Sequence, residues 1–261
     1  MRIITWNINS LRLRMTTLAK ISDKLAPDVI CLQEIKVEDS LFPENDIKTL
    51  GYKHILYRGM KSYNGVAIIS KVPLTGVKKR LWCNKDDCRH IAASLPNGVE
   101  INNFYVPAGG DVPDPVENEK FAHKITFLSE MAKWFSTQKP ANRILVGDLN
   151  VAPLETDVWS HKQLLKIVSH TPIEVARLEK AMRSHDWIDA VRKIIPPEEH
   201  LYSWWSYRNR TWPGTNRGRR LDHIWVTPGL IEKVYNAKVF VEARGWDKPS
   251  DHAPVMIDIK I

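Results

Sequence analysis

The sequence predicts an α/β fold in which two β-sheets pack face to face and helices cover their outer faces. First, short apolar runs rich in β-branched residues alternate with a few segments of helical periodicity. Second, each half of the chain has an apolar run that ends in two polar residues spaced by two, Asn7 and Asn9 early and Asp148 and Asn150 later. Third, no linker, low-complexity segment or strict repeat interrupts the chain, which predicts one domain spanning residues 1–261.

The predicted strands are short apolar runs bounded by residues that favour turns. Their side chains are mainly Val, Ile, Leu, Phe, Tyr and Trp, which fit a pleated and half-buried surface. In chain order, the predicted strands are residues 2–9, 27–34, 63–70, 98–106, 142–150, 221–226 and 253–261.

Three segments are predicted to be helices. Residues from about 10 to 25 carry one apolar stripe behind a capping Ser10. Apolar positions from Phe121 to Phe135 recur at spacings of four and three, which favours a helix packed on a sheet over a partner surface. The third helix begins at Thr171, because the stretch TPIE has the pattern of a capping box with proline at the first helical position.

Composition indicates a protein of the reducing cytoplasm. No apolar run approaches the roughly 20 residues needed to cross a bilayer, so we expect no membrane association. The first residues, MRIITWNINS, do not have the pattern of a signal peptide. The three cysteines, Cys31, Cys83 and Cys88, are too few for a disulfide framework and are predicted to be free thiols.

The net charge of the chain limits the classes of partner that we expect. A net charge of +8 favours a polyanion, namely nucleic acid, phospholipid head groups or a phosphorylated metabolite, although a merely soluble basic protein has the same total. The distribution is more informative than the total. Between Glu199 and Asp222 there is no acidic residue, and the arginines of this stretch are interleaved with tryptophan and tyrosine.

Acids and amides recur where the predicted strands end. Glu34 follows the apolar run VICLQ directly, and Asp222 lies just inside the strand LDHIWV. With the polar pairs in NIN, DLN and SDH, the strand ends carry four carboxylates, three amides and one imidazole. Any one acid is more often a solvated cap, but several acids that converge would repel one another without a cation. A hard, oxygen-preferring ion such as Mg²⁺ fits, whereas no second imidazole stands at zinc-ligand spacing.

This combination of groups suits the hydrolysis of a phosphate ester. Such a reaction needs a positioned water, neutralised phosphoryl oxygens and a stabilised leaving oxygen. Asp148 and Asn150 could hold one water between them, and a nearby carboxylate would keep His252 protonated by raising its pKa. Asp251 and His252 can both face a substrate only from a turn, which Pro249-Ser250 supplies.

A series of motifs resembles the exonuclease III family of apurinic/apyrimidinic endonucleases and 3′ exonucleases, within the endonuclease/exonuclease/phosphatase superfamily. The motifs are TWNIN, LQEIK, YVP, GDLNVAP, NRGRRLD and SDHAP, and they span residues 5–254 in the family's order. The resemblance implies a four-layer α/β sandwich, a Mg²⁺ or Mn²⁺ cofactor and base-excision repair of DNA.

The resemblance also implies site residues by position. Glu34 would be the main metal ligand, Asp148 would orient or deprotonate the attacking water, and Asp222 would hydrogen-bond His252. Tyr105 would lie near the phosphate or the leaving oxygen, and the identity of the formal base and acid stays open. The implied catalytic residues are Tyr105, Asp148, Asn150, Asp222 and His252. The implied metal-site residues are Asn7, Glu34, Asp148, Asn150, Asp251 and His252.

A lesion pocket and a DNA-binding loop follow from the same resemblance. Trp204 and Leu221 would form walls around a flipped-out abasic sugar, whereas Trp205 is predicted to pack in the core. The loop RNRTWPGTNRGRR resembles the family's duplex-penetrating element. Ala108, after YVP, departs from the polar residue that relatives commonly carry. The candidate DNA-binding residues are Arg89, Trp204, Arg208, Arg210, Trp212, Arg217, Arg219 and Leu221.

The implied partner is double-stranded DNA with abasic sites or 3′ ends, and nothing in the sequence predicts a dimer, so we expect a monomer. The implied enzyme cuts 5′ to abasic sites and trims 3′ ends, in a balance that the loop's own length and composition leave open. Two alternatives remain. A phosphatase of the superfamily acting on inositol phosphates or phospholipids would not need the aromatic pocket, and a DNA-binding module with a dead site would not need the clustered acids.

Overall fold

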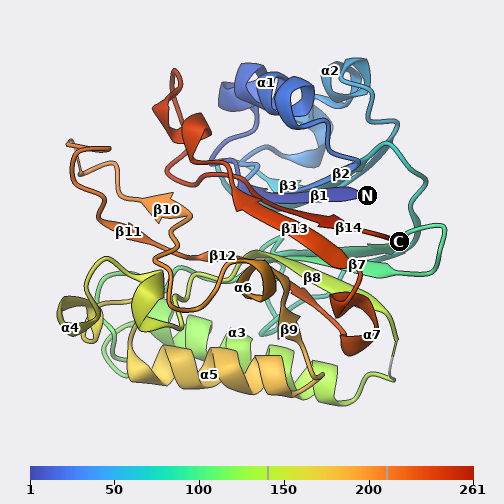
Figure 1. The fold of residues 1–261 in the computed structure, drawn as a ribbon. Coiled ribbons are helices and arrows are strands. Elements are labelled where there is room, and N and C mark those ends of the chain that lie inside the picture. Colours follow the sequence, from blue (N-terminus) through green and yellow to red (C-terminus); the bar gives the residue numbers. More distant parts are fainter. Residues whose placement is uncertain (140, 210) are drawn as a thin grey trace.

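In the computed structural model, the described residues, 1–139, 141–209 and 211–261, form two six-stranded sheets stacked face to face (Figure 1). Along its width, the first sheet contains β13 (Val234–Val239), β14 (Val255–Ile259), β1 (Arg2–Asn7), β2 (Val29–Gln33), β4 (Tyr63–Ser70) and β3 (His54–Met60). The second contains β5 (Thr75–Lys78), β6 (His90–Ser94), β7 (Glu100–Tyr105), β8 (Arg143–Asp148), β12 (Asp222–Val226) and β9 (Ile188–Asp189). A small separate sheet pairs β10 (Trp204–Trp205) with β11 (Gly218–Arg219).

Helices form the two outer layers, with α1 and α2 over the first sheet and α3 and α5 over the second (Figure 1). The α-helices are α1 (Met15–Leu25), α2 (Glu44–Thr49), α3 (Glu119–Ser136), α4 (His161–Leu164), α5 (Pro172–Arg183), α6 (Ala190–Ile194) and α7 (Pro228–Ile231). Short 3₁₀ helices are η1 (Arg12–Arg14), η2 (Asp39–Leu41), η3 (Glu155–Asp157) and η4 (Val241–Gly245). This arrangement confirms the predicted four-layer α/β sandwich. None of the described helices combines the length and apolar character needed to span a membrane.

The core consists of a central apolar layer between the sheets and one layer under each set of helices. Ile3, Val146 and Ile257 come from different strands and are all fully buried between the two sheets. On the outer side of the second sheet, Phe127 and Leu128 of α3 pack against strand residues, as the apolar periodicity of that helix predicts. Because both faces of the central strands are covered, their residues are almost all buried, including polar ones such as Gln33, Asn102 and Asn103.

The topology brings the polar strand ends to one rim. In each sheet one pair of neighbouring strands is parallel, β1 with β2 and β7 with β8, and a helix lies in each connection. Parallel strands end on the same side, so Asn7 lies opposite Gln33, directly before Glu34, and Tyr105 lies opposite Asp148. The antiparallel β12 starts at this rim, because its first residue is paired with the last residue of β8.

The predicted strands 2–9 and 142–150 are longer than the observed ones. β1 ends at Asn7 and β8 at Asp148, so Asn9 and Asn150 lie beyond the sheet with φ angles of +46° and +55°. In each case the backbone N–H of the asparagine donates to the side chain two residues earlier, at 3.1 Å for Asn9 and 3.0 Å for Asn150. A local side-chain turn therefore replaces extended pairing at both positions.

Ser10 does not cap the first helix as predicted. Its φ is +84°, and its N–H donates to the Glu34 carbonyl at 2.8 Å, so the chain is still held beside the loop after β2. The regular α-helix begins only at Met15, after η1. The capping box of α5 has the predicted partners, since Glu174 accepts from the Thr171 N–H at 3.1 Å.

Candidate active site

Asn7 links the ends of the two sheets. Its amide nitrogen donates to Glu34 Oε1 at 2.9 Å and to Asp148 Oδ2 at 2.9 Å. Its oxygen accepts from the Asn9 N–H, so the nitrogen and not the oxygen faces the carboxylates. The side chain is fully buried, and two acids separated by 114 positions in sequence therefore meet around one amide.

His252 lies between two carboxylates on the other side of Asp148. Its Nδ1 is 2.8 Å from Asp222 Oδ2, and its Nε2 is 3.7 Å from Asp148 Oδ2. Ser203 Oγ also donates to Asp222 Oδ2 at 2.6 Å, whereas Asp222 Oδ1 is buried and has no hydrogen-bond partner among the described residues. The ring is therefore oriented by Asp222 toward Asp148.

Burial and neighbouring charges move the pKa values of this group in opposite directions. Burial raises the pKa of Asp148 to about 7, with the Asp222 charge adding to the shift and His252 opposing it. Burial alone would lower the pKa of His252, but Asp222 and Asp148 raise it to about 10. At neutral pH the imidazole is therefore a cation and a proton donor, and Asp148 titrates in the physiological range.

Glu34 forms the other half of the cluster. Tyr105 donates to its Oε1 at 2.7 Å, and the Lys36 ammonium lies 2.7 Å from its Oε2. Burial would raise the pKa of Glu34, but Lys36, Asn7 and Tyr105 together lower it. Sequence reasoning did not assign Lys36 a place in the site, although its position two residues after Glu34 in LQEIK was available as a signal.

Asp251 borders the cluster rather than facing its centre. Its two oxygens accept from Asn9 Nδ2 at 2.9 Å and from Trp204 Nε1 at 3.0 Å. Burial would raise its pKa, but His252 and these two donors lower it. Asp251 thus connects the polar cluster to the aromatic side chain next to it.

The donor chemistry of this cluster fits a hard divalent cation. Carboxylate oxygens of Glu34 and Asp148 lie on either side of one amide group, and Asp222 presents a buried oxygen without a partner among the described residues. An oxygen of Asp148, an oxygen of Asp222 and a nitrogen of His252 also lie within 4.8 Å of one another. A protonated imidazole has no lone pair for a metal, so His252 would bind the ion only in its neutral form.

An apolar wall stands beside the acids. Trp204 and Trp159 pack against a small cluster that contains the buried residues Ala152, Leu164 and Leu221. Trp204 is only partly buried, and β10 pairs it with Arg219 while an isolated bridge pairs it with His252. Trp205 is 2% exposed and packs in the central layer, as predicted. Trp159 belongs to this wall but was not identified from the sequence.

The residues predicted to contact DNA differ in their exposure to solvent and in the contacts they already make within the protein. Arg208 and Arg217 are exposed, and the Arg217 guanidinium lies 4.7 Å from the Trp159 ring centroid. Arg219 donates to Val168 O and Ser169 Oγ, both at 2.8 Å, and stacks on Trp204. Arg210 lies outside the described residues.

Trp212 and Arg89 pack against other parts of the chain. Trp212 contacts the central apolar layer, and its ring centroid is 6.2 Å from that of Trp205. Arg89 lies 4.7 Å above the Tyr105 ring and forms an ion pair with Asp87. Arg89 thus lies beside a residue of the site, whereas Trp212 packs against the central apolar layer.

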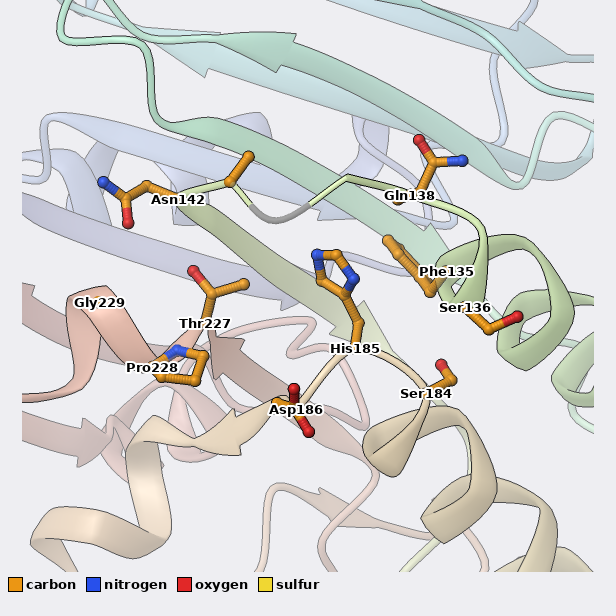
Figure 2. A pocket seen from close by; sticks show the side chains of 11 residues that line it. Phe135, Ser136, Gln138, Asn142, Ser184, His185, Asp186, Thr227, Pro228 and Gly229 are labelled. Atoms are coloured by element: carbon orange, nitrogen blue, oxygen red, sulfur yellow. The ribbon is translucent and has the colours of Figure 1, made fainter.

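A cavity of about 560 Å³ lies far from the acids, at the opposite end of β8 and β12 (Figure 2). Its lining includes His185, Asp186, Asn142 and Thr227. Figure 2 shows these side chains around a space between the end of α3 and the start of α7. It does not contain the clustered acids that phosphate-ester chemistry requires, so it is not the candidate active site.

The chain is similar to a family of nucleases and phosphatases. Residues 4–252 match the Endonuclease/Exonuclease/phosphatase family. The exodeoxyribonuclease III of Haemophilus influenzae is 32% identical, with 100% of both chains covered.

Solved structures give the same result. An AP endonuclease from Archaeoglobus fulgidus has a TM-score of 0.93 and 31% identity, with both chains covered completely. A Neisseria 3′ phosphatase bound to a product DNA hairpin has a TM-score of 0.92 and 27% identity, again over 100% of each chain.

Proposed function

This chain belongs to the endonuclease/exonuclease/phosphatase family, and from that premise we propose that it is a metal-dependent DNA repair nuclease of the exodeoxyribonuclease III type. It hydrolyses the phosphodiester 5′ to abasic sites and removes nucleotides or blocking groups from 3′ ends of duplex DNA. The names of its relatives, an exodeoxyribonuclease III and an AP endonuclease among them, support this activity.

One observation carries the proposal for this chain. A protonated His252, held by Asp222 at 2.8 Å, lies beside a carboxylate with a pKa of about 7 and beside an aromatic wall. The acids and the cation suit a phosphodiester, and the wall suits an extruded sugar without a base. An inositol phosphate would not use the wall, and a DNA binder without activity would not place buried carboxylates against phosphate.

The proposed mechanism assigns a role to each side chain. Asp148 orients the attacking water and accepts its proton, and the His252 imidazolium donates a hydrogen bond to a phosphoryl oxygen. Tyr105, held against Glu34, lies where its hydroxyl can contact the phosphate or leaving oxygen. Asn150 fixes the water or phosphate from the turn after β8.

Glu34 is the proposed main ligand of a Mg²⁺ or Mn²⁺ ion, and Asn7 and Asp251 shape the site through their hydrogen bonds. When bound, the ion supplies positive charge that neutralises the phosphoryl oxygens. For Asn7 this role is that of a donor to Glu34 and Asp148, because its amide nitrogen faces both carboxylates.

The proposed substrate is double-stranded DNA with abasic sites or 3′ ends. Trp204 and Leu221 contact the extruded sugar, and the exposed Arg208 and Arg217 contact phosphates. The Arg219 guanidinium stacks on the Trp204 ring, so Arg219 affects the binding of the abasic sugar by positioning that tryptophan. We also propose that residues 1–261 act as one domain, as a monomer and in the cytoplasm.

The experiment uses purified protein, Mg²⁺ and a duplex with one abasic analogue. We expect cleavage on the 5′ side, abolished by EDTA and lowered by about 10³-fold or more in Asp148→Asn. Binding without cleavage would overturn the proposal in favour of a binding module. Phosphate release from inositides without any cut in DNA would overturn it in favour of a phosphatase.

A further inference from the structure

Lys124 of α3 is a fully buried lysine whose ammonium reaches the back of the candidate site. It donates to the Asn150 carbonyl at 2.6 Å, to the Ala108 carbonyl at 3.2 Å and to the Glu174 carboxylate. An ammonium has three protons, and here it has three acceptors. The neighbouring loop is fitted to it, since a Cβ on Gly109 would lie 2.9 Å from Lys124 Cδ.

Glu174, the ionic partner of Lys124, is also fully buried and holds a second segment. Its oxygens accept from the Ser169 N–H at 2.9 Å and from the Thr171 hydroxyl at 2.6 Å. Ser169 in turn accepts from Arg219 at 2.8 Å, and its carbonyl accepts from the Ala152 N–H at 2.7 Å. The ion pair therefore contacts both the turn after β8 and the segment on which Arg219 rests.

Lys124 completes the hydrogen bonding of the turn after β8. Asn150 has a left-handed φ of +55°, a conformation that asparagine adopts more readily than other residues with a Cβ. Its N–H donates to Asp148 Oδ1 and its amide nitrogen to the Val106 carbonyl. The contact from Lys124 engages the remaining polar group of its backbone, the carbonyl, and so fixes the plane of the following peptide.

A buried ion pair is weak support for stability, because desolvation of both charges offsets their attraction. Apolar side chains of similar volume would fill the space without that desolvation cost, but they would leave the Asn150 and Ala108 carbonyls without their donor. The retained value of the pair is thus the geometry that it imposes on the chain.

Building on the proposed nuclease function, we propose that Lys124 is a positioning residue for turnover. Its ammonium fixes the Asn150 carbonyl and thereby the orientation of the Asp148–Asn150 turn relative to the phosphate. Glu174 neutralises the ammonium and extends the same support to residues 169–171.

The test is the double variant Lys124→Met/Glu174→Gln, which removes both charges and avoids leaving one of them buried alone. We expect the variant to fold, with a somewhat lower melting temperature because two carbonyls lose their donor. We expect kcat for abasic incision to fall about 10- to 100-fold, because small displacements of catalytic groups have effects of this size. KM and the DNA dissociation constant measured in EDTA should change less than about threefold, since the DNA-contacting side chains are retained.

The matched control is Arg143→Met/Glu100→Gln, which removes a buried ion pair at the opposite end of β7 and β8. This control should retain kcat whatever its effect on stability. A folded Lys124→Met/Glu174→Gln variant with kcat within about threefold of the unchanged protein would overturn the inference. So would a loss confined to KM.

A second variant covers the case in which the double variant does not fold. Lys124→Gln/Glu174→Gln also removes both charges but keeps a neutral donor on a shorter side chain, so kcat should still fall at least about tenfold at unchanged DNA affinity, and retention of kcat would overturn the inference. Failure of this inference can be distinguished from failure of the proposed function. If the unchanged protein does not cut abasic DNA, the proposed function fails, and if both forms cut equally, only the role of Lys124 fails.

Discussion

Asn7 lies between two carboxylates, the partly buried Glu34 and the buried Asp148. Its amide group donates to Glu34 and to Asp148, each at 2.9 Å, so it separates their charges while satisfying one oxygen of each. On the other side of Asp148, the raised pKa of His252 supplies a compensating positive charge. The site therefore combines a carboxylate that titrates near neutrality with an imidazole that stays protonated.

These two groups predict the pH dependence of incision. Asp148 must be ionised to accept a proton, so kcat/KM should fall as pH drops below about 7. His252 must be protonated to donate, so kcat/KM should fall as pH rises above about 10. The Asp222→Asn variant removes the anion nearest Nδ1 and should lower the upper pKa by at least about one unit. The measurement is the pH–rate profile, with the exposed Asp23→Asn as control, and an unchanged upper limb in Asp222→Asn would contradict the assignment.

At the scale of elements, β10 and β11 carry the aromatic wall. Their pairing sets Trp204 opposite Arg219, and the Trp204 indole is held by Asp251 at 3.0 Å. The wall is thus attached to the same loop as His252 and cannot move independently of the acids. The 3′ end of a duplex requires no extruded sugar in this position, whereas an abasic site does.

This difference predicts a substrate-dependent effect of the wall. Trp204→Ala should lower incision at an abasic site about tenfold more than it lowers removal of a 3′-phosphate, because stacking against the extruded sugar is lost. Arg219→Ala should have the same selectivity through its contact with Trp204. Steady-state rates on the two substrates measure this, with Tyr235→Ala on the distant strand β13 as control. Equal losses on both substrates would remove the lesion-pocket assignment.

The pairing of β7 with β8 depends on one glycine next to the site. A Cβ at Gly147 would lie 1.9 Å from the Phe104 carbonyl oxygen, and the φ of Gly147 is +148°. The close approach of the two strands places Asp148 beside Tyr105. A methyl group here would push the strands apart at the rim.

Gly147→Ala should therefore destabilise the protein by at least about 3 kcal/mol. Gly98→Ala is the matched control, since it also has a positive φ but open space around its Cβ, and it should cost only about 1–2 kcal/mol. Urea unfolding at fixed pH gives both free energies. Equal losses of unfolding free energy at the two positions would mean that the strands move apart at Phe104 with little loss of stability, which would contradict the prediction.

The two sheets of the molecule share part of their plan. Each contains one parallel strand pair joined through a helix, and one strand of each pair ends in a side-chain turn, NIN after β1 and DLN after β8. Stacking the sheets brings both turns to one rim. The net charge of +8 and the exposed arginines at 208 and 217 then make that rim suited to a polyanion.

Charge at this scale predicts the salt dependence of DNA binding. The logarithm of the association constant should fall linearly with the logarithm of salt concentration, and Arg208→Ala should make the slope less steep by about one. Lys260→Ala, beyond the far end of β14, should leave the slope unchanged. Fluorescence anisotropy in EDTA over a salt series provides the measurement. Slopes that are identical for Arg208→Ala and the unchanged protein would exclude this arginine from the phosphate contacts.

The sequence by itself determined the fold class, the central strands and the groups at their ends. Apolar runs with the period of a strand, followed by acids and amides, are local signals. It missed β3, whose residues are all only half-buried, and β13, whose polar residues conceal the pattern. It also missed the short strands β5 and β6 of the second sheet. It also placed Asn9 and Asn150 on extended chain, because a turn stabilised by the preceding side chain has no periodicity to reveal it.

Only the tertiary structure decided which groups meet. Three contacts join segments far apart in sequence. They are the amide of Asn7 between Glu34 and Asp148, the ammonium of Lys124 on the Asn150 carbonyl, and the packing of Trp212 against the central apolar layer. A side chain's charge state and role depend on burial and on partners that the chain supplies from elsewhere. The local sequence shows which chemical group stands at each strand end, and the stacking of the two sheets determines which other groups surround it.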